Sequence, residues 1–504
     1  MANVYLIGAG PGDPGLMTIR GKEILETADV VVYDYLANKE FLAYAKPGAE
    51  FLYVGKKGGD HTLPQDKINQ LIVELAKSGK VVARLKGGDP YVFGRGGEEA
   101  EELVEAGLTF EVVPGVTAGV AAAAYAGIPI THRRFTPSVA FITGHEDPTK
   151  DESSHDWVAY AQSKSTLVFY MGVKNLPDIA SRLMGAGMDP ETPVALVRWG
   201  TRCNQQSMVS TLEKVADEAA RRKFAAPSII IVGGVCELAE KLAWFEKRPL
   251  FGRGVVVTRA REQASDLSKL IRDMGGCVYE FPTIAVSQVL DDEPLEKAVL
   301  GLAAYDWLVF TSVNGVKFFW DKLAELFLDA RALAGIQVAA IGPATADELK
   351  KRGILPDFVP EKYVAESIVD GLLERGVAGK RVLIPRAREA REVLPEELAK
   401  AGAVVEILPV YETTLAQEDP SEILEALESG SIHFLTFTSS STVHNFFKLV
   451  DPEEIRRRRG DLKIACIGPV TAKTLSGYGF EADIQPEDYT IPALAQALTQ
   501  ARQG

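Results

Sequence analysis

Cysteine is scarce in this 504-residue sequence, and the few cysteines lie far apart. Cys203, Cys236, Cys277 and Cys466 form no C-x-x-C pair, so we expect no metal site and four reduced thiols. Long apolar runs are also missing, since glycines and a proline interrupt even the stretch over residues 116–130. The sequence therefore predicts neither a metalloprotein nor a membrane protein.

An excess of positive charge is missing as well. With 55 Lys and Arg against 69 Asp and Glu, the formal net charge is -14, so we expect no nucleic-acid partner. The balance of 46% hydrophobic and 25% charged residues is that of a soluble globular protein. The chain opens directly into an apolar stretch at Val4 with no basic leader or cleavage site, which predicts a cytoplasmic protein.

A chain of 504 residues is too long for one compact core, so we expect two to four domains. Residues 1–114 alternate apolar stretches, such as 30–33, with helical segments. This alternation predicts a parallel sheet that binds its ligand at the carboxyl ends of the strands. Asp34, the loop over 8–15 and the loop over 87–97 all fall at such ends.

A second α/β domain is predicted over residues 115–245. An alanine-rich helix leads into four β-branched stretches, which we expect to be strands at 138–143, 166–170, 193–197 and 228–232. Proline and glycine punctuate a basic turn over residues 246–254, which we interpret as a linker. We expect the functional site in the crevice between the two domains.

The sequence from residue 255 onward contains an internal duplication. At offsets of about 127 residues, Val255–Arg261 is echoed by Val382–Arg388, Phe310–Ser312 by Phe437–Ser439, and Ile341–Pro343 by Ile467–Pro469. Each repeat predicts one small doubly wound α/β lobe. Polar residues at the strand ends favour a ligand cleft over simple tandem stability.

The segment over residues 84–97, RLKGGDPYVFGRGG, is the most informative loop. Gly87 and Gly88 allow the backbone to approach a ligand where any Cβ would clash. Asp89 precedes Pro90 and is biased out of helix, so its carboxylate can point at whatever the loop holds. A tight strand-to-helix turn without a ligand is the alternative.

The loop over residues 8–13, GAGPGD, does not match a dinucleotide fingerprint. The pattern G-x-G-x-x-G requires glycine where Asp13 stands, and Pro11 lies where a helix should begin to open. Asp13 would also repel a phosphate. A neutral or cationic ligand suits this loop better, and S-adenosylmethionine, with its positive sulfonium, is such a ligand.

Several motifs in order resemble uroporphyrinogen-III C-methyltransferases over nearly all of residues 3–245; they lie at 4–20, 33–34, 54–56, 82–98, 113–118, 127–133, 170–172 and 200–201. The resemblance implies the tetrapyrrole methyltransferase fold, two α/β domains with S-adenosylmethionine between them. It also implies a homodimer and two methylations of uroporphyrinogen III, giving precorrin-2 on the route to siroheme and cobalamin.

The resemblance implies cofactor contacts at nine positions, namely Pro11, Gly87, Gly88, Asp89, Val92, Thr117, Ala118, Met171 and Gly200. It implies Asp34 as proton acceptor and Lys56 as proton donor. A strand-end cap and a solvated surface charge are the alternatives for these two. Because the substrate carries many carboxylates, we expect basic residues along its groove, among them Arg84, Arg95 and Arg133.

Residues 252–504 resemble uroporphyrinogen-III synthase, a lyase that cyclises hydroxymethylbilane. The resemblance implies two lobes, residues 255–285 with 416–504, and residues 286–412. This reaction depends on positioning and electrostatics. Strand-end hydroxyls and two equivalent arginines are candidate substrate contacts: Thr311, Ser312, Ser439, Ser440, Thr471, Arg259 and Arg386. Tyr411 matches a family tyrosine proposed to assist loss of the hydroxyl, with packing as the alternative.

We therefore predict a bifunctional enzyme that acts on small tetrapyrroles and joins synthase and methyltransferase in one chain. One alternative keeps the methyltransferase and treats the C-terminal half as a non-catalytic ligand-binding regulatory module. Another makes that half a two-lobed solute-binding protein.

Overall fold

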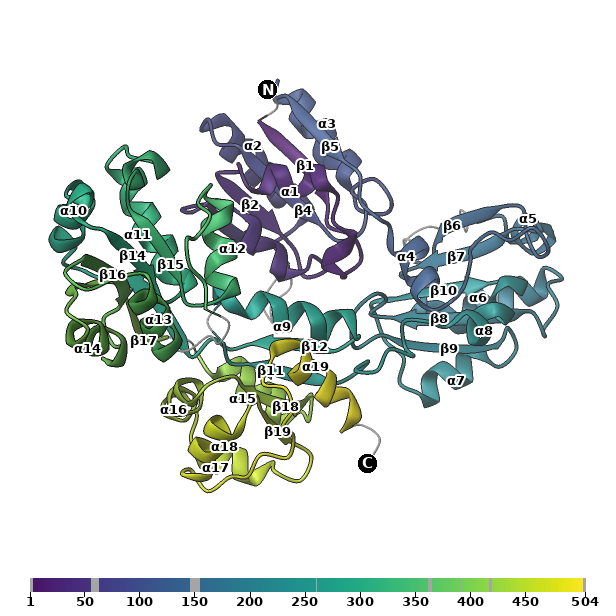
Figure 1. The fold of residues 1–504 in the computed structure, drawn as a ribbon. Helices are drawn as coiled ribbons and strands as arrows, with labels where there is room; N and C mark the ends of the chain where they lie inside the picture. The colour runs from purple at the N-terminus through teal and green to yellow at the C-terminus, as the bar shows by residue number, and fades with distance from the viewer. Residues whose placement is uncertain are drawn as a thin grey trace. The chain divides into compact units, whose positions relative to one another are not determined.

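The computed structural model describes residues 3–55, 63–145, 155–259, 261–360, 365–390, 392–416 and 419–501. The chain divides into two compact units. One consists of the residues up to Gly254 together with Leu270–Cys277, and the other of Val255–Lys269 together with Val278–Ala501. Four β-sheets organise the described residues (Figure 1).

A parallel five-stranded sheet forms the first part of the chain. Its elements are β1 (Val4–Gly8), α1 (Ile19–Leu25), β2 (Val30–Tyr33), β3 (Glu50–Tyr53), α2 (Gln65–Lys77), β4 (Val82–Lys86), α3 (Gly96–Glu105) and β5 (Phe110–Val113). The strand order is β3-β2-β4-β1-β5, and every pair is parallel, as the βαβ alternation predicts. Helices α2 and α3 pack on one face of the sheet and α1 on the other.

The second sheet is mixed. Its elements are α4 (Ala118–Tyr125), β6 (Val139–Thr143), α5 (Trp157–Gln162), β7 (Thr166–Tyr170), α6 (Leu176–Gly185), β8 (Pro193–Arg198), β9 (Gln206–Thr211), α7 (Val215–Arg221), β10 (Ser228–Val232) and α8 (Ala239–Leu242). The order is β6-β7-β10-β8-β9, with β10 antiparallel to both of its neighbours. The four expected strands are present within one residue at their ends, whereas β9 was not expected.

Two further sheets make up the rest of the described chain. Their elements are β11 (Gly254–Val257), α9 (Arg261–Asp273), β12 (Cys277–Glu280), β13 (Ile284–Gln288), α10 (Glu293–Leu300), β14 (Trp307–Phe310), α11 (Val313–Glu325), β15 (Gln337–Ala340), α12 (Pro343–Lys351), α13 (Ala365–Glu374), β16 (Arg381–Ala387), α14 (Val393–Lys400), β17 (Val404–Leu415), α15 (Ser421–Glu428), β18 (Ile432–Phe437), α16 (Ser440–Leu449), α17 (Pro452–Arg457), β19 (Lys463–Cys466), α18 (Pro469–Ser476) and α19 (Ile491–Gln500). Short 3-10 helices are η1 (Pro14–Leu16), η2 (Lys39–Tyr44), η3 (Val173–Asn175), η4 (Gly234–Leu238), η5 (Leu302–Ala304) and η6 (Ala330–Leu333).

The duplication predicted from the sequence is visible in the topology of these two sheets. One has the order β12-β11-β18-β19, and the other repeats it as β17-β16-β14-β15, with β13 added antiparallel to β17. Details recur at the same offset. Ser312 caps α11 and Ser439 caps α16, each with its side-chain oxygen accepting a main-chain N–H. The fold-class prediction is confirmed, while the individual domain boundaries stay predictions.

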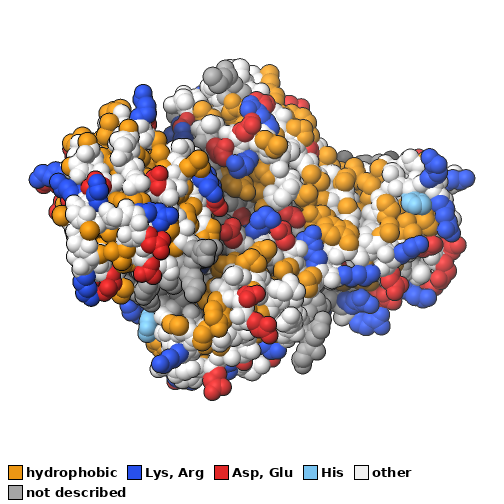
Figure 2. All heavy atoms as spheres, viewed as in Figure 1, with side chains coloured by type: hydrophobic (Ala, Val, Ile, Leu, Met, Phe, Trp, Pro, Cys, Tyr) orange, Lys and Arg blue, Asp and Glu red, His pale blue; other side chains and the backbone are white. Residues whose placement is uncertain are grey.

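The surface and the helices add two observations. On the face shown in Figure 2, acidic and basic side chains are interspersed. No helix among the described residues combines the length and apolar composition that crossing a membrane requires.

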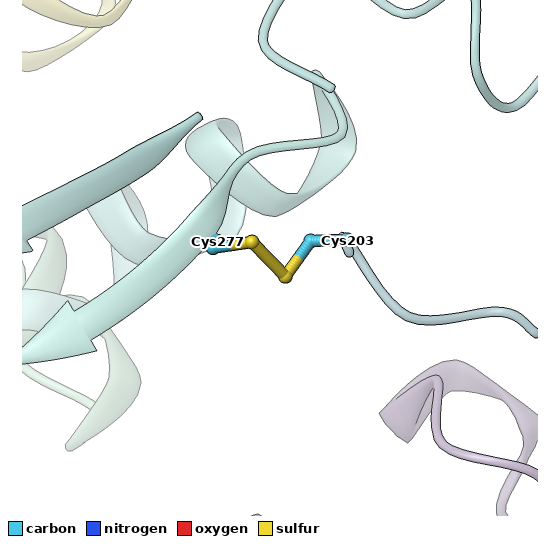
Figure 3. Close-up of a disulfide and its surroundings, with 2 residues drawn as sticks. All are labelled: Cys203 and Cys277. Carbon is cyan, nitrogen blue, oxygen red and sulfur yellow. A yellow bond between two sulfur atoms is a disulfide. The ribbon is translucent and has the colours of Figure 1, made fainter. Parts of the chain in front are cut away.

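The expectation of four reduced thiols is wrong for one pair. Cys203 and Cys277, both in the first compact unit, form a disulfide with their Cα atoms 5.2 Å apart (Figure 3). The pair is separated by 74 residues, so nothing local in the sequence announces it. Cys236 and Cys466 are free and buried, and burial raises the pKa of each thiol to about 12, so both stay protonated.

The disulfide predicts the number of reactive thiols. The purified chain, denatured without reductant and treated with an alkylating reagent, should take up two labels. After reduction it should take up four, because the sequence has four cysteines. Intact-mass spectrometry reads both counts, and four labels without reductant would contradict the disulfide.

Candidate functional site

Two glycine-rich loops meet beyond the carboxyl ends of β1 and β4. Gly10 N donates to Gly88 O (3.1 Å), and Gly88 N donates to Gly10 O (2.7 Å). The segment after β5 joins them, since a Cβ on Gly115 would lie 2.3 Å from Gly88 O and a Cβ on Gly8 would lie 2.4 Å from Gly115 N. Neither position can accept a side chain without moving main chain. The loops and the segment therefore form a cradle of main-chain atoms.

Asp89 holds the second loop in shape. Its Oδ1 accepts from Tyr91 N (2.8 Å) and Val92 N (3.1 Å), and its Oδ2 accepts from Gly115 N (3.0 Å). The expectation that this carboxylate points at a ligand is therefore corrected, because both oxygens are engaged by main-chain N–H groups. The Asp-Pro step starts an Asx turn, in which the side chain bonds to the backbone that follows it.

Backbone strain gathers in the loops predicted to hold the cofactor. Seven described non-glycine residues have positive φ, and five of them lie in these loops: Phe93, Arg95, Met171, Trp199 and Thr201. Each such conformation costs on the order of 1 kcal/mol or more and persists only where the surrounding structure enforces it. Strain of this kind is typical of ligand sites.

Tyr170 organises the contribution of the second sheet. Its Oη lies 2.7 Å from Thr117 Oγ1 and accepts from Gly119 N (2.8 Å), and burial raises the pKa of the phenol. Gly200 packs on the same helix, because a Cβ there would lie 2.4 Å from a β-carbon of α4. Thr117 and Gly200 are thereby brought to one helix, and Met171 directly follows Tyr170.

Asp13, the residue that breaks the dinucleotide fingerprint, ties the first loop to the second domain. Its N–H donates to Thr201 Oγ1 (3.0 Å), and its carboxylate accepts from Gly15 N (2.8 Å) and from the Tyr125 hydroxyl (2.7 Å). Burial, followed by the bond to Asp13, raises the pKa of Tyr125 above its ordinary value. Pro11 therefore lies in a loop that is anchored on both sides.

Asp34 lies at the end of β2 with 26% of its side chain exposed. Its Oδ1 accepts from Leu36 N (3.1 Å), and its Oδ2 accepts from Arg84 Nη2 (3.2 Å). Leu36 also contacts the second loop, because a Cβ on Gly87 would lie 2.4 Å from Leu36 Cβ. The candidate base is thus held beside the cradle.

The expectation that Arg84 lines the substrate groove is corrected. Its side chain is 3% exposed and is paired with Asp34 and Glu99. Arg84 follows Val82 on the face of β4 that α2 and α3 cover, so its side chain runs beneath those helices. Sequence reasoning missed Glu99, although charged residues at alternating positions of an otherwise apolar strand were a signal.

The other basic residues predicted for the methyltransferase half, Arg95, Arg133 and Lys56, differ in their surroundings. Arg95 forms two hydrogen bonds to Glu98, at 2.9 and 2.7 Å, and Arg133 is exposed. Lys56, the expected proton donor, lies outside the described residues.

In the second unit, the Tyr411 hydroxyl of β17 lies 3.1 Å from Ser312 Oγ at the start of α11. Ser312 Oγ also accepts from Gly315 N (3.0 Å), and the tyrosine ring stacks on Phe318 with centroids 5.7 Å apart. Two predicted residues are thereby brought together, with Thr311 next to them in the chain. Tyr411 is fixed in position by packing and by a hydrogen bond.

The remaining predicted residues of this unit fall into two groups. Ser439 caps α16, Ser440 accepts from Thr474 Oγ1 (2.8 Å), and Thr471 is buried in α18. Arg386 differs from its expected open position, since it is 5% exposed and paired with Glu392. Arg259 is half-buried after β11.

Comparison with known proteins matches both halves of the chain. Residues 3–216 match the family model described as Tetrapyrrole (Corrin/Porphyrin) Methylases, and residues 265–496 match the model described as Uroporphyrinogen-III synthase HemD. The porphyrin biosynthesis protein HemD of Ruminiclostridium josui is 39% identical over 98% of this chain and 97% of that protein.

Two further similar proteins match the first half. The S-adenosyl-L-methionine-dependent uroporphyrinogen III methyltransferase of Methanosarcina barkeri is 52% identical over 47% of this chain and 94% of that protein. The crystal structure of uroporphyrin-III C-methyl transferase from Thermus thermophilus, complexed with S-adenyl homocysteine, is 38% identical and covers 46% of this chain and 92% of that chain, with a TM-score of 0.40.

The close packing of the cradle predicts that adding one methyl group at Gly115 weakens cofactor binding. Gly115→Ala should weaken S-adenosylmethionine binding at least tenfold, because the added Cβ meets main-chain oxygen at 2.3 Å. Titration calorimetry measures the affinity. Gly97→Ala is the matched control, since a Cβ there meets nothing within 4 Å. Unchanged affinity in Gly115→Ala, or an equal loss in both variants, would rule out the cradle as the binding surface.

Proposed function

The chain belongs to the porphyrin biosynthesis family in which a tetrapyrrole methylase precedes a uroporphyrinogen-III synthase, and we propose that it catalyses two consecutive reactions. The C-terminal half cyclises hydroxymethylbilane to uroporphyrinogen III. The N-terminal half methylates this product twice with S-adenosylmethionine, giving precorrin-2. The observation that carries the proposal is similarity to a single relative over 98% of the chain, which includes both halves.

The residues of the first site fit S-adenosylmethionine. We propose that an uncharged adenosine packs against the main chain of these glycine-rich loops, where few side chains stand in its way. Lys86 and Arg95, the cations that flank the second loop, are each paired with a glutamate, which disfavours a phosphate ligand. Residues expected to hold the cofactor are Pro11, Gly87, Gly88, Asp89, Val92, Thr117, Ala118, Met171 and Gly200.

In methyl transfer, the residues of this chain position the substrate and accept a proton. When bound, S-adenosylmethionine supplies an electrophilic methyl group from its sulfonium. Methylation of a pyrrole carbon leaves a cation that must lose a proton, and Asp34 is the proposed acceptor. Lys56 is the proposed proton donor. Because Leu36 N and Arg84 already hold the Asp34 carboxylate, little ordering is left for the reaction itself.

In the cyclisation, hydroxymethylbilane loses its hydroxyl group as water and closes with inversion of its last ring. The Tyr411 hydroxyl donates a hydrogen bond to the departing hydroxyl, and its contact with Ser312 orients it. The hydroxyls of Thr311, Ser439, Ser440 and Thr471 and the guanidinium group of Arg259 are the proposed substrate contacts for this reaction, whereas Arg133 is a proposed contact for the substrate of methylation.

We also propose a homodimer formed through the methyltransferase half and a cytoplasmic location. The resemblance to homodimeric methyltransferases supports the dimer, and the acidic composition is compatible with the cytoplasm. Size-exclusion chromatography with light scattering tests the homodimer. A monomeric mass at micromolar concentration would reject it. Cell fractionation tests the cytoplasmic location.

Asp34→Asn should separate the two activities. Supplied with hydroxymethylbilane and S-adenosylmethionine, the full-length variant should accumulate uroporphyrinogen III, with methylation at least a hundredfold slower than in the unaltered chain. The reason is that the amide cannot accept the proton. Chromatography of the oxidised products measures both steps. A normal yield of precorrin-2 would exclude Asp34 as the acceptor.

Tyr411→Phe should have the opposite effect. Formation of uroporphyrinogen III should slow at least tenfold, while methylation of supplied uroporphyrinogen III stays unchanged. The same experiment tests the regulatory-module alternative. If the unaltered full-length chain yields only the type I porphyrinogen, which forms without a catalyst, the C-terminal half is no synthase.

A further inference from the structure

A cluster of buried charges lies beneath the candidate base. Glu99 of α3 is fully buried, and the side chains of Arg84 and Lys86 in β4 are 3% and 5% exposed. Glu99 Oε1 accepts from Lys86 Nζ (2.7 Å), from Arg84 Nε (3.2 Å) and from Gln65 Nε2 (3.2 Å). One carboxylate oxygen therefore gathers two cations and an amide.

These three residues occupy positions that a simple core would fill with apolar side chains. The buried stripe of α3 contains Gly96, Glu99, Ala100 and Leu103, so Glu99 stands in a row of small and apolar residues. Arg84 and Lys86 continue the row that Val82 begins on the helix-covered face of β4. Removing such ions from water is costly before they pair, and well-packed apolar residues are often as stable. Stability alone therefore does not account for the cluster.

The hydrogen bonds of Arg84 connect the cluster to the site. Besides the bond from Nε to Glu99, Nη1 donates to Leu85 O (3.1 Å) and Nη2 donates to Asp34 Oδ2 (3.2 Å). The guanidinium group is planar, so holding Nε and Nη1 fixes the direction in which Nη2 points. Glu99 thereby acts on Asp34 through a rigid group.

The second oxygen of Glu99 adds to this picture. Oε2 is buried and has no hydrogen-bond partner in the part of the chain that the structure describes. All donors converge on Oε1, on the side that faces Arg84 and Lys86. The donors that reach Glu99 thus hold its carboxylate by the oxygen that faces Arg84.

We propose that Glu99 is a positioning residue for methyl transfer, holding Arg84 so that its Nη2 keeps the Asp34 carboxylate where it accepts the proton. The proposal rests on the proposed methyltransferase function. Glu99 itself touches neither substrate nor cofactor in this scheme. The competing explanation is that the cluster only holds α3 on the sheet.

Glu99→Gln in the full-length chain tests the proposal, because it keeps the shape of the side chain and removes its charge. With uroporphyrinogen III supplied, kcat for methylation should fall at least tenfold. The KM for uroporphyrinogen III and the affinity for S-adenosylmethionine, measured by calorimetry, should stay within threefold of those of the unaltered chain. Glu101→Gln is the matched control, since Glu101 lies on the same helix and is exposed. It should leave all three quantities unchanged.

Two more variants keep the test decisive. Loss of Glu99 leaves two neighbouring buried cations, so Glu99→Gln is also combined with Lys86→Met, which restores the charge balance. In this double variant kcat should remain low while cofactor affinity is kept. In an Asp34→Asn background, Glu99→Gln should lower the single-turnover rate less than twofold further, because its effect passes through Asp34.

The outcomes separate the two levels of the argument. A kcat within twofold of the unaltered chain, a parallel loss of kcat and cofactor affinity, or a full tenfold effect added to Asp34→Asn would each overturn the positioning role. If the unaltered chain itself does not methylate uroporphyrinogen III, the proposed function fails instead.

Discussion

The first site depends on one constraint, that three segments meet through their main chains. Gly10 and Gly88 exchange two hydrogen bonds, and Gly8 and Gly115 lie so close that a β-carbon on either would collide with backbone. No rotamer change can relieve such a collision, because backbone atoms cannot turn away. The cradle is therefore specified by the absence of side chains, and residues around it, such as Met171 and Thr201, have positive φ angles that the surrounding structure enforces.

The charged side chains discussed for the first half are held by hydrogen-bond or ion-pair partners. Asp89 and Asp13 are engaged by main-chain or phenolic donors, and Arg95 is paired with Glu98 on the surface. The buried cluster of Glu99, Arg84 and Lys86 is the exception in its cost, since it puts ions where apolar side chains would serve the fold. Arg84 bonds both to Glu99 in this cluster and to Asp34. The cluster therefore connects the core of the first sheet with the proposed base at the end of β2.

The second half of the chain is built from two copies of one α/β lobe. The strand order of one lobe is repeated in the other, and the capping serines Ser312 and Ser439 recur at the same offset. The two copies have nevertheless diverged where chemistry is expected. Tyr411 contacts the first of these serines, whereas the second is followed by Ser440, which bonds to Thr474. The duplicated scaffold thus supplies positions, and the residues placed there differ.

The sequence by itself determined the parallel first sheet, the repeat in the second half and the glycine loops, because periodicity and glycine spacing are local properties of the chain. It did not reveal the disulfide between Cys203 and Cys277, the burial of Arg84 and Arg386, or the hydrogen bond from Gly115 N to Asp89. Each of these depends on which residues distant in the chain become neighbours. From the sequence, an arginine such as Arg84 is expected to be a surface charge. Only the tertiary structure shows that α3 places the buried Glu99 beside it.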